Sequence, residues 1–165
     1  MNERIRIAPA AGSDVPLILS FIRKLAEYEK LLHLVVTTEA QIHENVFGSN
    51  PVAEVLLAYW DGEPVGFALY FRNFSTFLGQ PGIYLEDLFV EPEHRGKGIG
   101  KALLIRLANI AIERGYGRLE WAVLDWNTPS IEFYRRLGAV ALDQWTAYRL
   151  TGDALQRLAG TEPRP

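Results

Sequence analysis

The spacing of apolar residues changes several times along the chain and predicts alternating strands and helices. Residues 4–8 alternate basic and apolar side chains, which indicates a strand. Apolar side chains recur every three or four positions over residues 15–32, which predicts a helix that Ser13 or Asp14 could cap. A second, shorter helix is expected over residues 38–46.

The middle of the chain has the pattern of a sheet. Two apolar runs flank the pair Asp61-Gly62, which is a strong signal for a β-hairpin. Further along, the pattern predicts strands over 82–90, 118–126 and within 139–151, and helices over 101–115 and 128–138. This order predicts an α/β (α+β) domain with a mostly antiparallel sheet and one parallel crossover.

Composition narrows the class of protein. The 165 residues suit one domain over 1–165, with a frayed tail over 160–165. A formal net charge of -3 argues against a general nucleic-acid binder. The absence of cysteine excludes disulfides and a thiol nucleophile and makes a cytoplasmic setting the default, and no apolar run is long enough to cross a membrane. The three histidines lack the spacing of metal ligands, so no metal is expected.

Residues 95–101 place alternate glycines among basic residues at the start of a helix. Glycine lets the backbone approach a ligand closely, and a helix N-terminus presents unpaired N–H groups with a partial positive charge. The combination predicts a site for a phosphate group. The residues concerned are Arg95, Gly96, Lys97, Gly98, Ile99, Gly100 and Lys101.

Three phosphate-binding patterns compete for this loop. A P-loop needs Ser or Thr after the lysine, but Ala102 follows Lys101. A dinucleotide loop needs Gly-x-Gly-x-x-Gly and an acid about 20 residues later. Glu120 stands at that distance, but the glycines run Gly-x-Gly-x-Gly. The third pattern, Arg-x-x-Gly-x-Gly, is met by Arg95, Gly98 and Gly100.

This third pattern resembles the coenzyme A loop of the GCN5-related N-acetyltransferases (GNAT). The segment "YLEDLFV" before the loop and "WNTPSIEFYRRLGA" after it resemble the cofactor strand and the C-terminal motif of that family. Together with "RKLAEYEKL" near the N-terminus, they are similar to the diamine (spermidine/spermine) acetyltransferase branch. The resemblance implies a sheet of six to seven strands flanked by helices.

The resemblance also implies where acetyl-CoA binds. Its diphosphate would lie on the backbone amides from Gly96 to Lys101, and its pantetheine arm would pair with the backbone of Leu88, Phe89 and Val90. The Leu88 N–H would then lie near the thioester carbonyl, where it could stabilise developing negative charge. Asn127 would bond the pantetheine arm.

The acceptor implied by the resemblance is a primary amine of a small cation: a diamine, a polyamine or a lysine-like amine. Such an amine is protonated at neutral pH, so it must lose a proton before it attacks. Glu86 is the candidate base, directly or through a water, although it could also be a structural acid or only attract the cation. Asp87 would face the opposite side of a regular strand. Tyr134 is the candidate acid for the leaving thiolate, with a core aromatic as the alternative.

The acceptor is expected to lie near Tyr28, Glu29, Glu86 and Glu120, and a homodimer is expected as in related proteins. One departure weakens the prediction of polyamine specificity, since Thr146 and Ala147 precede Tyr148 where diamine acetyltransferases tend to carry acids. Three other interpretations stay open: an acyltransferase that uses a propionyl or succinyl donor or acts on a protein amine, a non-catalytic coenzyme A sensor, and a nucleotide-binding regulatory domain.

Overall fold

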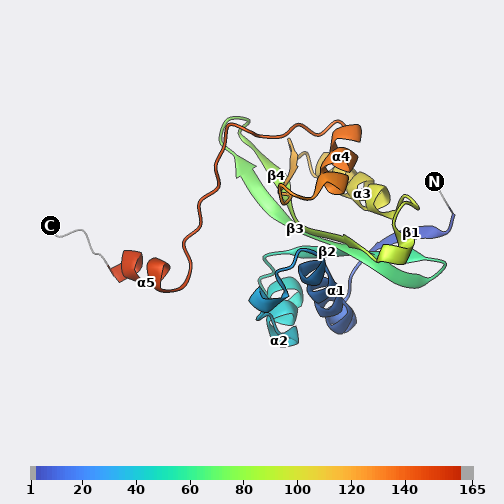
Figure 1. Ribbon diagram of the computed structural model, residues 1–165, viewed down its shortest axis with the longest axis horizontal. Helices are drawn as coiled ribbons and strands as arrows, with labels where there is room; N and C mark the ends of the chain where they lie inside the picture. The colour runs from blue at the N-terminus through green and yellow to red at the C-terminus, as the bar shows by residue number, and fades with distance from the viewer. Residues whose placement is uncertain (1–2, 161–165) are drawn as a thin grey trace. The chain divides into compact units, whose positions relative to one another are not determined.

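The computed structural model describes residues 3–160, which divide into two compact units (Figure 1). The first unit extends to Leu124 and contains the sheet, and the second begins at Asp125. The prediction of a single domain over 1–165 stays a prediction. Of the predicted frayed tail, Gly160 ends a helix and residues 161–165 lie outside the described part of the chain.

The first unit is built on a five-stranded sheet in the order β1-β2-β3-β4-β5. Neighbouring strands from β1 to β4 are antiparallel, and β5 is parallel to β4, so the predicted mixed, mostly antiparallel sheet is confirmed. The Asp61-Gly62 hairpin joins β2 to β3 as predicted. The strands are β1 (Ile5–Pro9), β2 (Glu54–Trp60), β3 (Glu63–Ser75), β4 (Gln80–Val90) and β5 (Leu119–Trp121).

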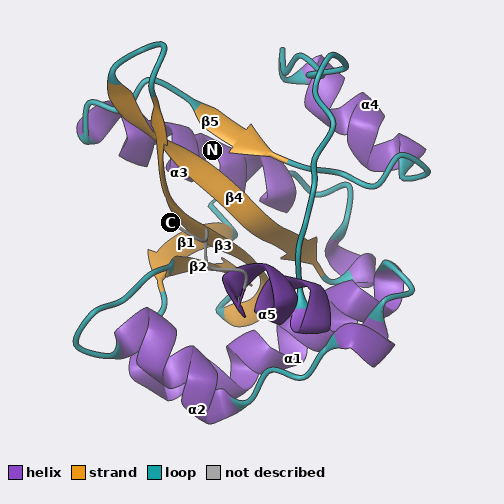
Figure 2. Cartoon of the chain, turned by 90° about the vertical axis from the view of Figure 1, so that its left-hand side faces the viewer, coloured by secondary structure: helices purple, strands orange, loops and turns teal. Residues whose placement is uncertain are grey.

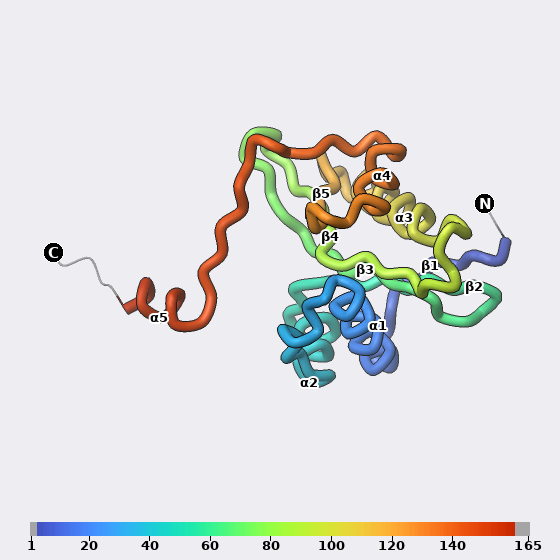
Figure 3. The backbone as a smooth tube through the Cα atoms, viewed as in Figure 1, coloured from blue at the N-terminus to red at the C-terminus, as the bar shows by residue number. Residues whose placement is uncertain are grey.

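Helices cover both faces of this sheet (Figure 3). Helices α1 (Val15–Tyr28) and α2 (Glu39–Ile42) lie on one face, and α3 (Ile99–Glu113) lies on the other. The chain continues from α2 into a π-helical turn over His43–Phe47. Single 3-10 turns occur at Gly12–Asp14, Leu32–Leu34 and Pro92–His94.

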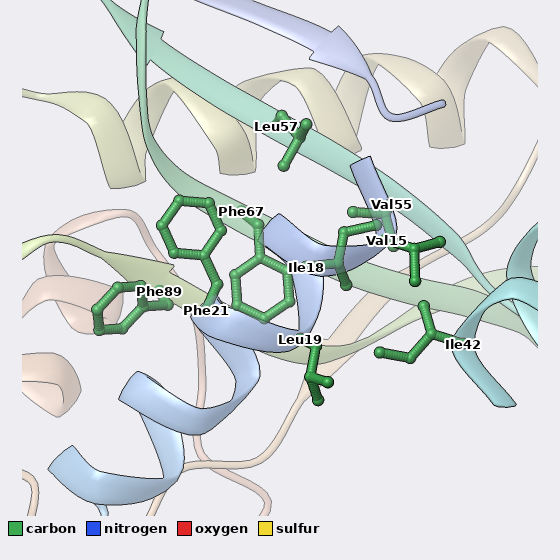
Figure 4. Packing of buried hydrophobic residues seen from close by; sticks show 9 residues of the cluster. All are labelled: Val15, Ile18, Leu19, Phe21, Ile42, Val55, Leu57, Phe67 and Phe89. Carbon is green, nitrogen blue, oxygen red and sulfur yellow. The ribbon is translucent and has the colours of Figure 1, made fainter. Parts of the chain in front are cut away.

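The core between α1 and the sheet fixes where α1 lies on the sheet. Phe21 of α1 stacks on Phe67 of β3, with ring centroids 5.7 Å apart, and contacts Phe89 of β4 at 5.8 Å (Figure 4). Ile18, one turn earlier, is fully buried in the same cluster. Burial of such side chains contributes roughly 1.5–3 kcal/mol each. The core therefore holds the middle of α1 against the C-terminal part of β4, to which Phe89 belongs.

Strand β4 departs from regular pairing at two places. Against β3, Leu69 pairs with Asp87 and Tyr70 pairs with Leu85, so Glu86 is the extra residue of a β-bulge. Against β5, β4 pairs only at Ile83, Tyr84 and Leu85. Figure 2 shows the longer β4 beside the short β5. Residues 87–90 pair with β3 on one side, and residues 86–90 form an open edge without a strand partner in the described sheet on the other.

The second unit contains two helices, α4 (Thr128–Arg136) and α5 (Gly152–Gly160). The final strand predicted within 139–151 is wrong, and the described residues form five strands rather than six to seven. The alternating pattern is present, but a strand also needs a neighbour for its backbone groups. The segment instead makes a turn in which the Trp145 N–H donates to the Leu142 carbonyl, and its apolar side chains are exposed.

Within residues 3–160, no helix has the length and apolar character needed to cross a membrane. The cytoplasmic setting stays a prediction.

Candidate active site

The predicted phosphate loop connects β4 to α3. Gly96 and Gly98 have φ angles of 76° and 90°, which L-residues with side chains rarely adopt. Gly98 is the N-cap of α3, and no side chain caps the helix there. The first N–H groups of an α-helix have no partner within the helix. This end of α3 therefore presents backbone donors that suit a diphosphate.

The open edge of β4 presents backbone groups in alternation. The Glu91 N–H donates to the Val65 carbonyl on β3 at 2.8 Å. In an antiparallel pair every second residue faces the same neighbour, so Phe89 and Asp87 also bond toward β3. The backbone groups of Leu88 and Val90 then face the open edge. Of the three residues predicted to pair with the pantetheine arm, Leu88 and Val90 are oriented for it and Phe89 is not.

Three carboxylates gather where the bulge meets the end of α1. Asp87 pairs with Leu69, which packs on the α1 core, so Asp87 lies on the α1 face of the sheet. Burial raises the pKa of Asp87 to about 7, with further contributions from the charges of Glu86 and Glu29. Burial also raises the pKa of Glu29. The structure thus brings together Glu29 and Glu86, two of the predicted site residues, around a carboxyl group that titrates near neutral pH.

The expectation that Glu86 and Asp87 face opposite sides assumed a regular strand. The bulge at Glu86 removes that regularity. Glu86 is exposed and Asp87 is half-buried, and their charges interact. Asp87 is the residue that the sequence interpretation missed, because its perturbed pKa comes from burial and from Glu29, which is distant in the sequence.

The basic residues of the loop have partners on different elements. The Arg95 Nε donates to the Val90 carbonyl at 3.0 Å, and its guanidinium lies 4.6 Å from the centroid of the Tyr28 ring. The Lys97 ammonium lies 5.1 Å from the centroid of the Trp60 ring. Lys101 is exposed on the first turn of α3.

Glu120 is held by other residues. Its Oε2 forms an ion pair with the Arg118 Nε at 2.8 Å and accepts a hydrogen bond from the Asn73 Nδ2 at 2.8 Å. Its negative charge is therefore already balanced by Arg118, which weakens the predicted role in attracting a cationic acceptor.

The second unit carries Asn127 and Tyr134 at the two ends of α4. Asn127 is the N-cap of α4, and its side chain accepts a hydrogen bond from the Ser130 N–H at 3.4 Å. Asn127 is buried, and this cap position explains its burial without a ligand. Tyr134 is half-buried, with its ring 5.3 Å from that of Phe133.

Comparison with known proteins decides the family. Residues 22–139 match the Acetyltransferase (GNAT) family. The chain belongs to the GNAT family. This GNAT chain is 41% identical to a thialysine N-epsilon-acetyltransferase of Bos taurus over 94% of its own length and 98% of that protein. It is 32% identical to a spermidine/spermine N(1)-acetyltransferase-like protein 1 of Homo sapiens, over 97% of its own length and 24% of that protein.

A solved structure agrees with the fold of this GNAT chain. An integron cassette protein from the mobile metagenome of V. cholerae superposes with a TM-score of 0.80 at 28% identity, over 97% of this chain and all of the other. The chain is an acetyltransferase, and the prediction of the family and of an enzyme is confirmed. Proteins of the GNAT family generally use acetyl-CoA as the acyl donor.

Proposed function

We propose that this chain transfers the acetyl group of acetyl-CoA directly to the primary amine of a small cationic molecule. One observation carries the proposal: the open edge of β4 lies beside the carboxylates of Glu86, Asp87 and Glu29. The edge suits an amide-bearing acyl donor, and the carboxylates suit an amine that arrives protonated.

The residues of the first unit fit acetyl-CoA. The amides from Gly96 to Lys101 would hold the diphosphate, because Gly98 leaves the N-terminus of α3 uncapped. The Leu88 backbone and the Val90 N–H would pair with the pantetheine arm along the open edge, since the Val90 carbonyl already accepts a hydrogen bond from the Arg95 Nε. Acetyl-CoA supplies the activated acetyl thioester when it is bound. The Leu88 N–H is the proposed donor to its carbonyl oxygen.

Two adjacent carboxylates are proposed to bind the protonated amine and to remove its proton. Glu86 is exposed on the bulge, where it can meet the amine or a water bound to it. Asp87, with a pKa of about 7, is well matched to accept a proton near neutral pH. The proposal therefore keeps Glu86 at the amine and adds Asp87 as the group that takes up the proton.

The second unit supplies the remaining roles. Tyr134 is the proposed acid that holds a proton for the departing sulfur, and Asn127 is a proposed partner of the pantetheine arm. Support for both comes from the resemblance of residues 126–139 to the C-terminal motif of the family and from the family match, which extends to residue 139.

The acceptor is proposed to be a small diamine or a lysine-like amine. Glu29 and Tyr28 at the end of α1, with Asp87 and Glu86, make an acidic and partly aromatic surface. The similar protein of Bos taurus is named for thialysine, and the human one is named as spermidine/spermine N(1)-acetyltransferase-like. Thialysine is therefore the first acceptor to test, followed by spermidine and lysine.

A panel of amines tests the proposed function. With acetyl-CoA present, we expect the thiol of coenzyme A to be released faster when thialysine is the acceptor than when spermidine or lysine is. A thiol reagent follows this release. Coenzyme A should raise the melting temperature of the protein and ATP should not, because binding to the folded state alone stabilises it. Stabilisation by ATP with no thiol release from any amine would contradict the proposal.

We also propose that the chain forms a homodimer through the hairpin between β3 and β4. Phe74, Phe77 and Leu78 at this hairpin are exposed, and 92% of Phe77 is accessible. Exposed apolar clusters of this kind often mark protein–protein contacts. Sedimentation equilibrium should give twice the chain mass, and Phe77→Glu should shift the protein toward monomer. A monomeric wild-type protein at micromolar concentration would contradict it.

A further inference from the structure

Two contacts fasten the last turns of α1 to the segment that leads into the glycine loop. Lys24 forms an ion pair with Glu91, and one helical turn later the Tyr28 ring lies under the Arg95 guanidinium at 4.6 Å. The two partners of α1, Glu91 and Arg95, are also four residues apart. The position of the loop and the position of the end of α1 are therefore linked.

The contacts of Arg95 are directed toward α1 and β4. Besides Tyr28, its guanidinium lies 5.8 Å from the Phe89 ring centroid, and its Nε donates to the Val90 carbonyl at 3.0 Å. The sequence interpretation placed Arg95 among the basic residues of the phosphate site. We propose instead that Arg95 is a positioning residue for the amine acceptor, which acts by holding Tyr28 and the end of α1 in place. This inference rests on the proposed function.

The end of α1 needs such support. Lys30 has a φ of 63°, a left-handed conformation that is unfavourable for a residue with a side chain. The helix ends there because the Lys30 N–H donates to the Glu27 carbonyl and the Leu31 N–H to the Ala26 carbonyl. Glu29, whose charge acts on Asp87, lies immediately before this turn. Contacts that hold Tyr28 thus also hold Glu29 near Asp87.

Kinetics and cofactor binding separate the two roles of Arg95. In Arg95→Gln, the KM for thialysine should rise about two- to fivefold, the expected worth of an exposed cation–π contact. The Kd of coenzyme A, measured by titration calorimetry, should change by less than this KM, because backbone amides rather than the Arg95 side chain hold the diphosphate in the proposed function. Arg95→Lys keeps the charge but loses the planar group that stacks on the ring, so it should give a smaller rise.

A double-mutant cycle tests whether Arg95 acts through Tyr28. Tyr28→Leu should raise the same KM, and adding Arg95→Gln to it should raise KM no further, because the two residues share one contact. Arg6→Gln is the matched control. It breaks the same kind of contact elsewhere, since the Arg6 guanidinium lies 3.8 Å from the Tyr59 ring centroid, and it should leave the KM for thialysine unchanged.

The outcomes distinguish this inference from the proposed function. If Arg95→Gln raises the Kd of coenzyme A and leaves the KM for the amine unchanged, Arg95 binds the diphosphate. That result would overturn this inference but not the proposed function. Additive effects in the double variant would overturn it as well. A wild-type protein that acetylates no amine would overturn the proposed function and this inference with it.

Discussion

Asp87→Asn is expected to abolish the dependence of the reaction on pH near neutrality and to lower kcat/KM for the amine by roughly a hundredfold, the low end for loss of a general base. In the wild-type protein, kcat/KM should rise with pH through about 7, as the Asp87 carboxyl loses its proton and becomes able to accept one from the amine. The measurement is kcat/KM for thialysine from pH 5.5 to 9 in both proteins.

Glu86→Gln is the matched comparison, because Glu86 is adjacent in the chain and carries the same charge. It should lower kcat/KM while the rise through neutral pH remains, with its midpoint shifted down because one of the charges that raise the pKa of Asp87 is gone. If Glu86→Gln instead removes the rise and Asp87→Asn retains it, Glu86 is the base and Asp87 is not.

The dependence of the free energy of unfolding on pH gives a second test of the raised pKa of Asp87. The pKa of Asp87 in the folded protein is about 7, above the ordinary value of about 3.9, so folding favours the protonated form. The contribution of this group is fully present below about pH 4 and is lost as the pH rises through 7. At pH 8, Asp87→Asn should therefore raise the free energy of unfolding, by up to about 4 kcal/mol. The two proteins should be equally stable near pH 4, as thermal unfolding can show.

Local signals in the sequence were sufficient for most of the first unit. Asp61 and Gly62 both have positive φ angles, 51° and 91°, which is the geometry that an Asp-Gly hairpin turn requires. The backbone turn of the phosphate loop could be predicted for the same reason, since Gly96 and Gly98 adopt conformations that other residues avoid. Features that depend only on the backbone of a few consecutive residues can be predicted from the types of those residues.

Features that depend on a neighbouring element could not be predicted in this way. The bulge at Glu86 appears only when β4 is paired with β3, and the pKa of Asp87 depends on burial and on Glu29 of another element. The segment 139–151 has the pattern of a strand, yet Trp145 and Tyr148 are 74% and 95% exposed and no ladder forms there. The alternation of apolar and polar residues predicts which face a strand would bury, but it does not show whether a neighbouring strand is there to pair with it.

Tyr134→Phe should slow turnover by roughly a hundredfold while leaving the Kd of coenzyme A within about twofold, since loss of a general acid affects the chemical step. An ordinary phenol, with a pKa of about 10, is a slightly weaker acid than a thiol, at about 8.5. Complete transfer of the proton to the departing sulfur is therefore mildly unfavourable for an unperturbed tyrosine. The hydroxyl can still contribute by hydrogen bonding as negative charge develops on the sulfur.

This argument predicts how the effect of Tyr134→Phe depends on the acyl donor. A thioester whose thiol is more acidic than coenzyme A needs less help to leave, so the loss of rate should shrink with such a donor. Tyr116→Phe removes the same hydroxyl from another half-buried tyrosine and should leave turnover unchanged. An unchanged rate in Tyr134→Phe with acetyl-CoA would remove the acid assignment, and an equal loss of rate with both donors would show that the hydroxyl acts before the sulfur leaves.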